Sequence, residues 1–390
     1  MTKWQEVKLE DVCFYVSQKM DTQPLSIYNY ISTENMLPNK SGITNASSLP
    51  NMPITPSFKK DDILVSNIRP YFKKIWLAQF AGGCSNDVLV FRANKNIDSK
   101  FLYYILSDDR FFEYSTQTSK GTKMPRGDKT SILKYAVLLP PLDVQKKIAG
   151  VLGALDDKIE LNNKINQNLE AQAQALFKSW FVDFEPFGGQ MPSDWKIGKL
   201  GDICECLLGG TPNRNIPEFW NGNIPWINSG EVNAFRITKP SEYISELGLS
   251  KSATKLLPAK TTVIAITGAT LGKVSLLEIN SCANQSVVGV LPNSNIPYEF
   301  IYPFVKHNIL ELISHQTGGA QQHINKQNVE QIKLYIPPYG ILHQYQTSVK
   351  PIYKMIANNC FENTRLAEVR DILLPKLMSG EISVDDVKID

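Results

Sequence analysis

The segment Gly268–Lys273 (GATLGK) resembles a phosphate-binding loop, in which backbone N–H groups and a lysine hold the phosphates of a nucleotide. That motif needs four residues between its glycines, and Ser or Thr must follow its lysine. In this sequence three residues separate the glycines, and Val274 follows Lys273. We therefore expect a tight turn between two strands here, not a nucleotide site.

The segment Ile336–Tyr339 (IPPY) resembles the Asn-Pro-Pro-Tyr motif of DNA methyltransferases that act on amino groups. The first residue of that motif must form a hydrogen bond with the target amino group, and Ile has no polar side-chain atom. The related segment Leu139–Leu142 (LPPL) begins with Leu and has the same defect. No glycine-rich cofactor loop follows a strand-like run, so S-adenosylmethionine binding is not expected.

Candidate metal ligands do not form a site in the sequence. Cys204 and Cys206 are neighbours, but no second cysteine pair or histidine cluster completes the four ligands that zinc needs. The four histidines lack HExxH spacing; they are His307, His315, His323 and His343. No Ser/His/Asp set or group of nuclease carboxylates stands out. We predict no catalytic residue, no metal site and no cofactor, and therefore a protein that is not an enzyme.

Basic and amide side chains gather instead in turn-like stretches. In the first half these are Lys59, Lys60, Arg69, Lys73, Lys74, Lys120, Lys123 and Arg126. In the second half they are Arg214, Lys260, Lys273, Gln321, Gln322, His323, Asn325 and Lys326. Arg and Lys suit guanine edges and phosphates, whereas Asn and Gln suit adenine edges. One such cluster is usually only a solvated surface, but matching clusters in both halves favour a DNA interface.

The chain contains two copies of one unit. Trp4–Cys13 aligns with Trp195–Cys204, with five identities in ten residues. Leu139–Pro141 aligns with Ile336–Pro338 at an offset of 197, and this offset continues without a gap through the following stretch. The period is far longer than the roughly 20–50 residues of a solenoid repeat. The sequence therefore predicts a duplicated domain and helix.

Each copy has a mixed first part and a helical second part. Short β-rich runs between Pro, Gly and Asn residues predict strands at Ile63–Val65, Val88–Phe91, Thr262–Thr267 and Val287–Leu291. Helical segments are expected at Lys100–Ser107 and Tyr298–Leu312. We predict an α+β protein with domains at 1–139 and 186–335, followed by helical regions at 140–185 and 336–390.

The helical regions carry a heptad pattern with a shared polar interruption. The apolar positions are Ile148, Leu152, Leu155, Ile159, Leu169, Ala173, Leu176 and Trp180, and in the second copy Val349, Ile352, Ile356, Leu366 and Leu373. Asn162 and Asn166 interrupt the first series, and Asn359 and Asn363 interrupt the second. A buried Asn in a heptad seam fixes the register of the paired helices. We expect the helices to pair as an antiparallel coiled coil with pseudo-two-fold symmetry, the alternative being that each packs only on its own domain.

Composition bounds the class of protein. The chain has 390 residues, 43% hydrophobic and 20% charged, which allows two or three compact domains. The net charge of +3 is low for a DNA-binding protein, but residues 1–139 carry +5 and residues 186–335 carry +1, whereas both helical regions are acidic. No apolar run is long enough for a membrane span and the first residues are polar, so we expect a cytoplasmic protein with no membrane partner.

The duplicated architecture resembles the specificity (S) subunit of type I restriction–modification enzymes. Six segments carry the resemblance in order and spacing over essentially the whole chain: Ser66–Pro70, Gly209–Pro212, Gly268–Lys273, Gly319–Asn325, Leu139–Ile148 and Leu374–Ile382. The resemblance implies two target-recognition domains that read the two halves of a split double-stranded DNA sequence, with the helices acting as a ruler. The copies differ at 125–127 and 322–324, so the two half-sites should differ.

The resemblance also implies partners. Two methyltransferase (M) subunits dock on such a chain, and nuclease–translocase (R) subunits join for cleavage. S-adenosylmethionine, Mg²⁺ and ATP then belong to those partner subunits. The alternatives are a self-contained DNA methyltransferase or nuclease, and a coiled-coil adaptor that does not bind DNA.

Overall fold

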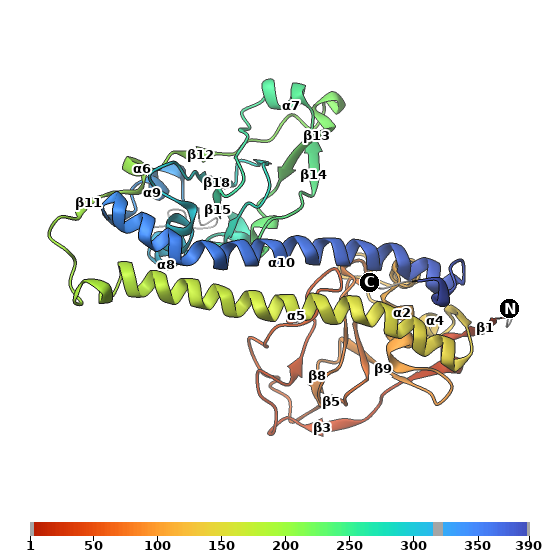
Figure 1. Ribbon diagram of the computed structural model, residues 1–390. Helices are drawn as coiled ribbons and strands as arrows, with labels where there is room; N and C mark the ends of the chain where they lie inside the picture. The colour runs from red at the N-terminus through yellow and green to blue at the C-terminus, as the bar shows by residue number, and fades with distance from the viewer. Residues whose placement is uncertain (1–3, 315–322, 388–390) are drawn as a thin grey trace. The chain divides into compact units, whose positions relative to one another are not determined.

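The computed structural model describes residues 4–314 and 323–387. The chain divides into two compact units, the first made of residues 1–157 with 366–390 and the second of residues 158–365. Both boundaries fall inside long helices. Each unit therefore contains part of α5 (Leu142–Phe181) and part of α10 (Tyr339–Ser379), drawn in yellow-green and blue in Figure 1.

The first unit is built around a four-stranded sheet with the order β2-β9-β6-β7. All four residues of its central strand β6 are buried, as a continuous apolar run predicts. The strands of the unit are β1 (Gln5–Lys8), β2 (Cys13–Tyr15), β3 (Lys19–Asp21), β4 (Tyr30–Ile31), β5 (Ile54–Phe58), β6 (Ile63–Ser66), β7 (Ile75–Leu77), β8 (Gly82–Cys84), β9 (Val88–Ala93) and β10 (Ala136–Leu139). Its shorter helices are α1 (Leu9–Val12), α2 (Ser99–Ser107), α3 (Asp109–Gln117), α4 (Lys129–Leu133) and the 3₁₀ turns η1 (Pro70–Phe72) and η6 (Val384–Asp386).

The second unit has a four-stranded sheet with the matching order β12-β18-β15-β16. Its strands are β11 (Lys196–Lys199), β12 (Cys206–Leu208), β13 (Trp220–Ile227), β14 (Glu242–Ile244), β15 (Thr262–Ala265), β16 (Val274–Leu276), β17 (Cys282–Ala283), β18 (Val287–Val290) and β19 (Lys333–Ile336). Its shorter helices are α6 (Leu200–Ile203), α7 (Glu246–Ser250), α8 (Tyr298–Ser314), α9 (Lys326–Glu330) and the 3₁₀ turns η2 (Glu185–Phe187), η3 (Pro217–Phe219), η4 (Glu231–Asn233) and η5 (Gly268–Thr270).

The structural duplication matches the one in the sequence. In both units the first strand pairs with the last, β1 with β10 and β11 with β19. The remaining sheets differ: the first unit has β3-β5-β8-β4 and the second has β14-β13-β17. The expected strands at Ile63–Val65, Val88–Phe91 and Val287–Leu291 correspond to β6, β9 and β18. The strand expected at Thr262–Thr267 ends at Ala265, because a turn follows there.

Each unit buries its long helices against its own α+β part. In the first unit, Phe101 of α2 belongs to one core with Leu152 of α5 and Leu377 of α10. In the second unit, the ring centroid of Phe181 of α5 lies 4.9 Å from that of Phe300 of α8 and 4.8 Å from that of Tyr345 of α10. These aromatic contacts make the helices part of the hydrophobic core of each unit.

The predicted antiparallel pairing of the two helices is confirmed. In the second unit, Asn162 Nδ2 donates to Asn363 Oδ1 at 2.9 Å, and Asn359 Nδ2 donates to Asn166 Oδ1 at 2.9 Å. The repeat offset of 197 converts the first contact into the second, which is the relation that pseudo-two-fold pairing requires. In the first unit, Arg370 Nη1 of α10 donates to an oxygen of Asp156 of α5 at 2.7 Å.

The buried face of α5 differs in detail from the predicted heptad. Leu169, Leu176 and Trp180 are only partly buried, whereas Phe177 and Phe181 are buried. The stripe that packs inward continues from Asn166 through Glu170 and Ala173, all buried. A charged residue within this stripe obscured it, because Glu is almost never fully buried unless it is paired.

Within the described ranges, no helix is long and apolar enough to cross a membrane. All six cysteines are free, and five of them are buried. Burial raises the pKa of Cys204 and Cys206 to about 12, so these thiols stay protonated at neutral pH.

Candidate nucleic-acid interface

In the first unit, two of the predicted basic loops lie side by side. The loop after β6 contacts the segment before α4, because Arg69 N–H donates to Pro125 O at 2.8 Å and Gly127 N–H donates to Asn67 O at 3.1 Å. Ile68 and Arg126 also form a β-bridge. The fold therefore brings Arg69 next to the loop that carries Lys120, Lys123 and Arg126.

The corresponding loops of the second unit make the corresponding contact. Ile324 N–H donates to Ile266 O at 3.1 Å, and Thr267 and His323 form a β-bridge. The loop that ends at Lys273 and the segment before α9 are therefore neighbours too. Gln321 and Gln322 lie outside the described residues.

The loop before α4 is a closed hairpin-like turn. Lys120 N–H donates to Arg126 O at 2.8 Å, and Arg126 N–H donates to Lys120 O at 2.9 Å. Arg126 Nη2 lies 3.0 Å from Asp87 Oδ1, and Lys120 pairs with Asp128. Hydrogen bonds from Lys120 and from the Ser131 backbone lower the pKa of Asp128 to about 2. Lys123, near the tip, is exposed.

The loop after β6 uses two of its lysines to hold its own shape. Lys73 Nζ lies 2.8 Å from Asp109 Oδ2, and Lys74 Nζ donates to Thr33 O at 2.6 Å. Burial alone would raise the pKa of Asp109, but hydrogen bonds from Lys40 and Lys73 outweigh it and lower that pKa. Arg69 is exposed and makes no ion pair with any described residue, so its guanidinium faces solvent.

The second unit places its predicted residues in different local settings. The Arg214 guanidinium lies 3.7 Å from the Trp220 ring centroid and pairs with Glu242 through two hydrogen bonds. The Gly268–Thr270 turn connects two antiparallel strands, which confirms the tight turn expected there, and Lys273 at its end is exposed. Asn325 caps α9, since its Oδ1 accepts from Asn328 N–H at 2.9 Å. Lys326 Nζ lies 3.2 Å from Glu330 Oε1.

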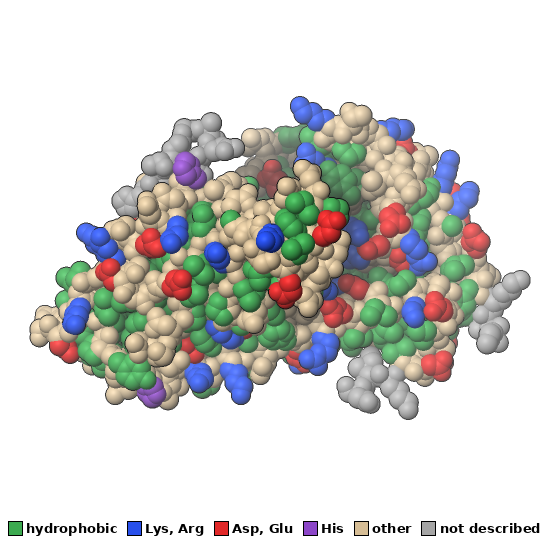
Figure 2. All heavy atoms as spheres, turned by 90° about the horizontal axis from the view of Figure 1, so that it is seen from above, with side chains coloured by type: hydrophobic (Ala, Val, Ile, Leu, Met, Phe, Trp, Pro, Cys, Tyr) green, Lys and Arg blue, Asp and Glu red, His purple; other side chains and the backbone are tan. Residues whose placement is uncertain are grey.

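Three predicted lysines lie away from these paired loops. Lys59 and Lys60 precede β6, and Lys260 precedes β15, so they stand at the other ends of the strands from Arg69 and Lys273. Lys260 pairs with Glu278 and lies over the Tyr298 ring. On the face shown in Figure 2, basic and acidic side chains are interspersed, without one continuous basic patch.

The second unit also contains a buried charged cluster that no sequence pattern indicated. Arg236 Nη2 donates to Glu170 Oε2 at 2.8 Å, and Arg236 Nη1 donates to Tyr302 Oη at 2.8 Å. Lys306 Nζ lies 2.9 Å from Glu170 Oε1, and Glu278 Oε1 lies 3.7 Å from Arg236 Nε. The Arg236 side chain is 0% exposed and that of Glu278 is 1% exposed. The cluster therefore connects the loop before β14 and the end of β16 with α8 and α5.

The opposite charges within this cluster offset the cost of burying them. Burial alone would raise the pKa of Glu170, but the positive charges of Arg236 and Lys306 outweigh it, so this pKa lies below its usual value. Thr238, in the same loop as Arg236, lies with its Oγ1 2.8 Å from Thr364 Oγ1 of α10. The cluster is thus a structural connection between the α+β part of the unit and both long helices.

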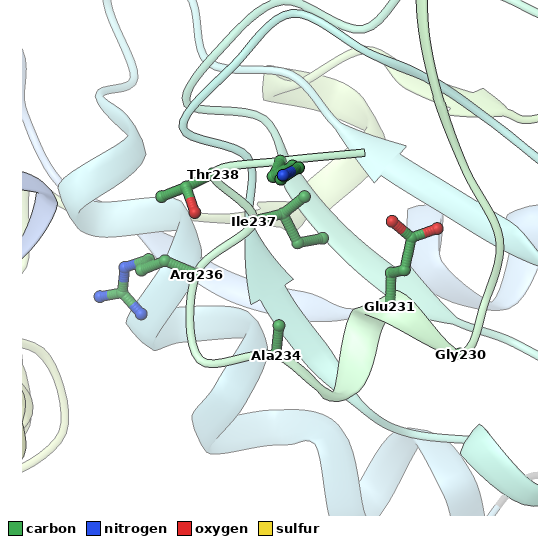
Figure 3. A pocket seen from close by; sticks show the side chains of 7 residues that line it. Gly230, Glu231, Ala234, Arg236, Ile237 and Thr238 are labelled. Carbon is green, nitrogen blue, oxygen red and sulfur yellow. The ribbon is translucent and has the colours of Figure 1, made fainter. Parts of the chain in front are cut away.

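The same loop lines a cavity of about 240 Å³. Figure 3 shows Arg236 and Glu231 on opposite sides of it, pointing away from each other. The carboxylate of Glu231 accepts hydrogen bonds from Asn228 N–H, Ser241 N–H and the Ser241 hydroxyl, which close its own loop. The cavity therefore does not assemble polar groups around a ligand. Among the described residues, no group of three or more His, Cys, Asp or Glu side chains is placed to hold a metal ion.

Comparisons with known proteins identify the family. The family model described as "Type I restriction modification DNA specificity domain" matches residues 1–171 and 192–370, which is most of the chain. The chain belongs to the type I restriction–modification specificity subunits. This family is non-catalytic and carries no cofactor itself, and its members are parts of a restriction–modification complex.

Individual relatives match this sequence over most of its length. The HindI specificity subunit of Haemophilus influenzae is 28% identical, and the match covers 98% of this chain and 100% of that protein. The MjaIX specificity subunit of Methanocaldococcus jannaschii is 30% identical over 74% of this chain and 70% of that protein. The crystal structure of an S subunit from M. genitalium has a TM-score of 0.55 at 16% identity and covers 96% of both chains, so this specificity subunit shares its fold.

Proposed function

We propose that this specificity subunit reads a split, asymmetric double-stranded DNA target, one half-site with each α+β domain. The proposed domains are residues 1–139 and 186–335, joined to helical regions 140–185 and 336–390. One observation carries the proposal: both units place the loop after their central strand beside the segment before α4 or α9, and these are the basic and amide-rich loops. The paired loops carry different side chains in the two units, so the half-sites should differ.

We further propose that α5 and α10 set the spacing between the half-sites. They have 40 and 41 residues, and a helix of that length extends about 60 Å. Two DNA-reading domains that contact one face of B-DNA need half-sites about one helical turn apart, or about 34–36 Å. Helices of this length can supply that separation.

The proposed partners follow from family membership. Two methyltransferase subunits bind the specificity subunit and carry out methylation, and nuclease–translocase subunits join for cleavage. S-adenosylmethionine, Mg²⁺ and ATP bind those partners. The complex acts in the cytoplasm, where its DNA substrate lies.

The test uses the complex of the specificity subunit with its methyltransferase subunits, once methylation mapping has defined the target. Arg126→Ala should weaken binding or relax specificity at one half-site, whereas His323→Ala or Gln322→Ala should do so at the other. Removal of one base-reading side chain should reduce affinity by about five- to hundredfold. Titrations with DNA substituted at each position of each half-site measure these effects.

The exposed ion pair between Lys147 of α5 and Asp385 provides a control for the loss of a surface cation. Lys147→Ala should leave DNA affinity unchanged at both half-sites. Affinity of the wild-type complex should fall steeply with salt, because phosphate contacts release counterions. Equal effects of Arg126→Ala on both half-sites, or binding without salt dependence and sequence preference, would contradict the proposal.

A further inference from the structure

Two large aromatic side chains are exposed in the loop after β6. Tyr71 is 48% exposed and Phe72 is 39% exposed, and their ring centroids lie 4.8 Å apart. They lie in the 3₁₀ turn η1, next to the exposed Arg69. Burial of a large aromatic side chain is strongly favourable because it removes a large apolar area from water. An exposed aromatic pair on a charged loop therefore suggests a surface that a ligand buries on binding.

The turn that presents this pair is firmly held. Asn39 N–H donates to Phe72 O at 2.9 Å, and Lys40 N–H donates to Lys73 O at 2.9 Å. The contacts of Lys73 with Asp109 and of Lys74 with Thr33 hold the far side of the turn. These contacts hold the turn that presents the aromatic pair in place.

The second unit has a related turn without aromatic residues. The turns start and end with a left-handed residue at matching positions: Arg69 (φ 50°) and Lys73 (φ 51°) in the first unit, and Gly268 (φ 69°) and Gly272 (φ 79°) in the second. At the offset of 199 that relates these turns, Thr270 takes the place of Tyr71. The second turn has Gly in place of Arg69 and Lys73 and no aromatic ring, and it keeps only Lys273 in place of Lys74. The turn itself therefore does not need Arg69 or the aromatic rings, which indicates that the first unit keeps them for a ligand.

We propose that Tyr71 and Phe72 form an aromatic wedge that stacks on DNA bases in the half-site read by the first domain. This inference rests on the proposed function. Aromatic side chains stack on bases whatever their identity, and apolar wedges insert between base steps. DNA is favoured over a protein partner because Arg69 adjoins the wedge and Arg69 N–H is bonded to Pro125 of the second basic loop. The second domain, with Thr270 at this place, lacks such a wedge.

The experiment is photochemical crosslinking with the assembled methyltransferase complex. Each pyrimidine of the target is replaced in turn by its 5-iodo analogue, which crosslinks on irradiation to an aromatic side chain stacked on it. Crosslinks to the peptide that contains Tyr71 and Phe72 should appear at one step of the first half-site and nowhere in the second. Tyr71→Leu with Phe72→Leu should abolish the crosslinks and reduce affinity by about five- to hundredfold.

Phe14→Leu is the matched control. Phe14 is 46% exposed, close to the value for Tyr71, but it lies on β2 opposite Arg92, away from the end of β6 that leads to Arg69. This variant should keep the crosslinks and the affinity, and thermal unfolding should show that all variants fold.

Three results would overturn the wedge. Crosslinks and affinity could survive in the double variant, which would show that the rings do not touch bases. The double variant could fail to bind the methyltransferase subunits in the absence of DNA, which would make the pair a protein contact. If the wild-type complex binds no specific DNA at all, the proposed function fails and the wedge fails with it.

Discussion

Arg69 and Gly268 occupy matching positions in their turns, and both have a positive φ. Glycine adopts this conformation without a steric penalty, whereas for an L residue with a side chain it costs about 1–2 kcal/mol. Residues with a strained backbone of this kind cluster at functional sites. Arg69 is exposed and adjoins the aromatic pair, so the cost falls on a residue that we expect to contact DNA.

Two substitutions of Arg69 distinguish the effect of its strained backbone on stability from the effect of its guanidinium on DNA binding. Arg69→Gly and Arg69→Ala both remove the guanidinium, but only Gly relieves the left-handed strain. We expect Arg69→Gly to be more stable than Arg69→Ala by about 1 kcal/mol, and both variants to bind target DNA equally weakly. Chemical denaturation and DNA titration measure the two effects. Unchanged DNA affinity in both would show that Arg69 has no contact with DNA.

The basic side chains near this turn were recognisable from the sequence, but their ion pairs were not. Lys73, Lys120 and Arg126 were grouped as candidate DNA contacts because they occur in turn-like stretches. Their partners Asp109, Asp128 and Asp87 are brought close only by tertiary structure. A single sequence therefore locates the loops without showing which cations are already engaged within the protein.

At the scale of elements, sequence periodicity predicted the helices well and their buried charges poorly. The helical region predicted at 140–185 contains α5, which extends from Leu142 to Phe181 and starts directly after a Pro-Pro pair. The Asn residues at the centre were evident because polar residues interrupt an apolar series. Arg236 and Glu170 were not, because each looks like a surface residue until the other is placed beside it.

The Arg236 cluster should dominate the stability of the second unit. Arg236→Met leaves Glu170 and Glu278 buried with less positive charge, which should destabilise the unit by about 3–5 kcal/mol. Arg214→Met is the control, since it breaks an ion pair in which the arginine side chain is 52% exposed and should cost about 0–1 kcal/mol. Calorimetric unfolding of both variants provides the comparison. Equal destabilisation by the two substitutions would show that burial of the cluster has no special effect.

The same cluster predicts a pH dependence. The pKa of Glu170 is lower in the folded protein than its usual value. The ionic contacts of Glu170 therefore stabilise the folded state fully above about pH 4.3, the usual pKa of Glu. This stabilisation is lost as the pH falls through the lower pKa of the folded protein. The stability difference between wild type and Arg236→Met should therefore narrow below about pH 4.3. Denaturation at a series of pH values tests this, and a constant difference would contradict it.

The hydrogen bond between Asn359 and Asn166 can be tested with a double-mutant cycle. Asn359→Leu removes the donor to Asn166 Oδ1, and Asn166 is only 2% exposed, so this variant should be less stable by about 1–3 kcal/mol. Adding Asn166→Leu removes the unpaired group and should recover most of that stability. Asn358→Leu, at the exposed neighbouring position, should change stability by less than about 0.5 kcal/mol. If the stability effects of Asn359→Leu and Asn166→Leu were strictly additive, the two side chains would not interact.

At the scale of the whole molecule, duplication was the strongest signal in the sequence. It predicted a duplicated domain and helix, and the four-stranded sheets of the two units have the same strand order. It did not predict the sheet β3-β5-β8-β4 or its different counterpart β14-β13-β17, because the copies diverge there. Long-range strand pairing in such segments depends on tertiary contacts that periodicity does not record.

The proposed ruler is tested by changing the length of both helices together. Removing one heptad from α5 and the opposite heptad from α10 shortens each by about 10 Å while keeping the phase of the seam. We expect the spacer between the half-sites to become shorter and the half-sites themselves to stay the same, as read by methylation mapping.

Shortening α5 alone gives the control for this change. A deletion in one helix separates Asn162 from Asn363, so the helices should no longer pair and the unit should be destabilised without a new spacer. Inserting a heptad in both helices should lengthen the spacer, because the same pairing is kept over a longer span. If the paired deletion folds and methylates DNA with the original spacer, then the helices do not set that distance, and the spacing must arise from the methyltransferase subunits that hold the DNA.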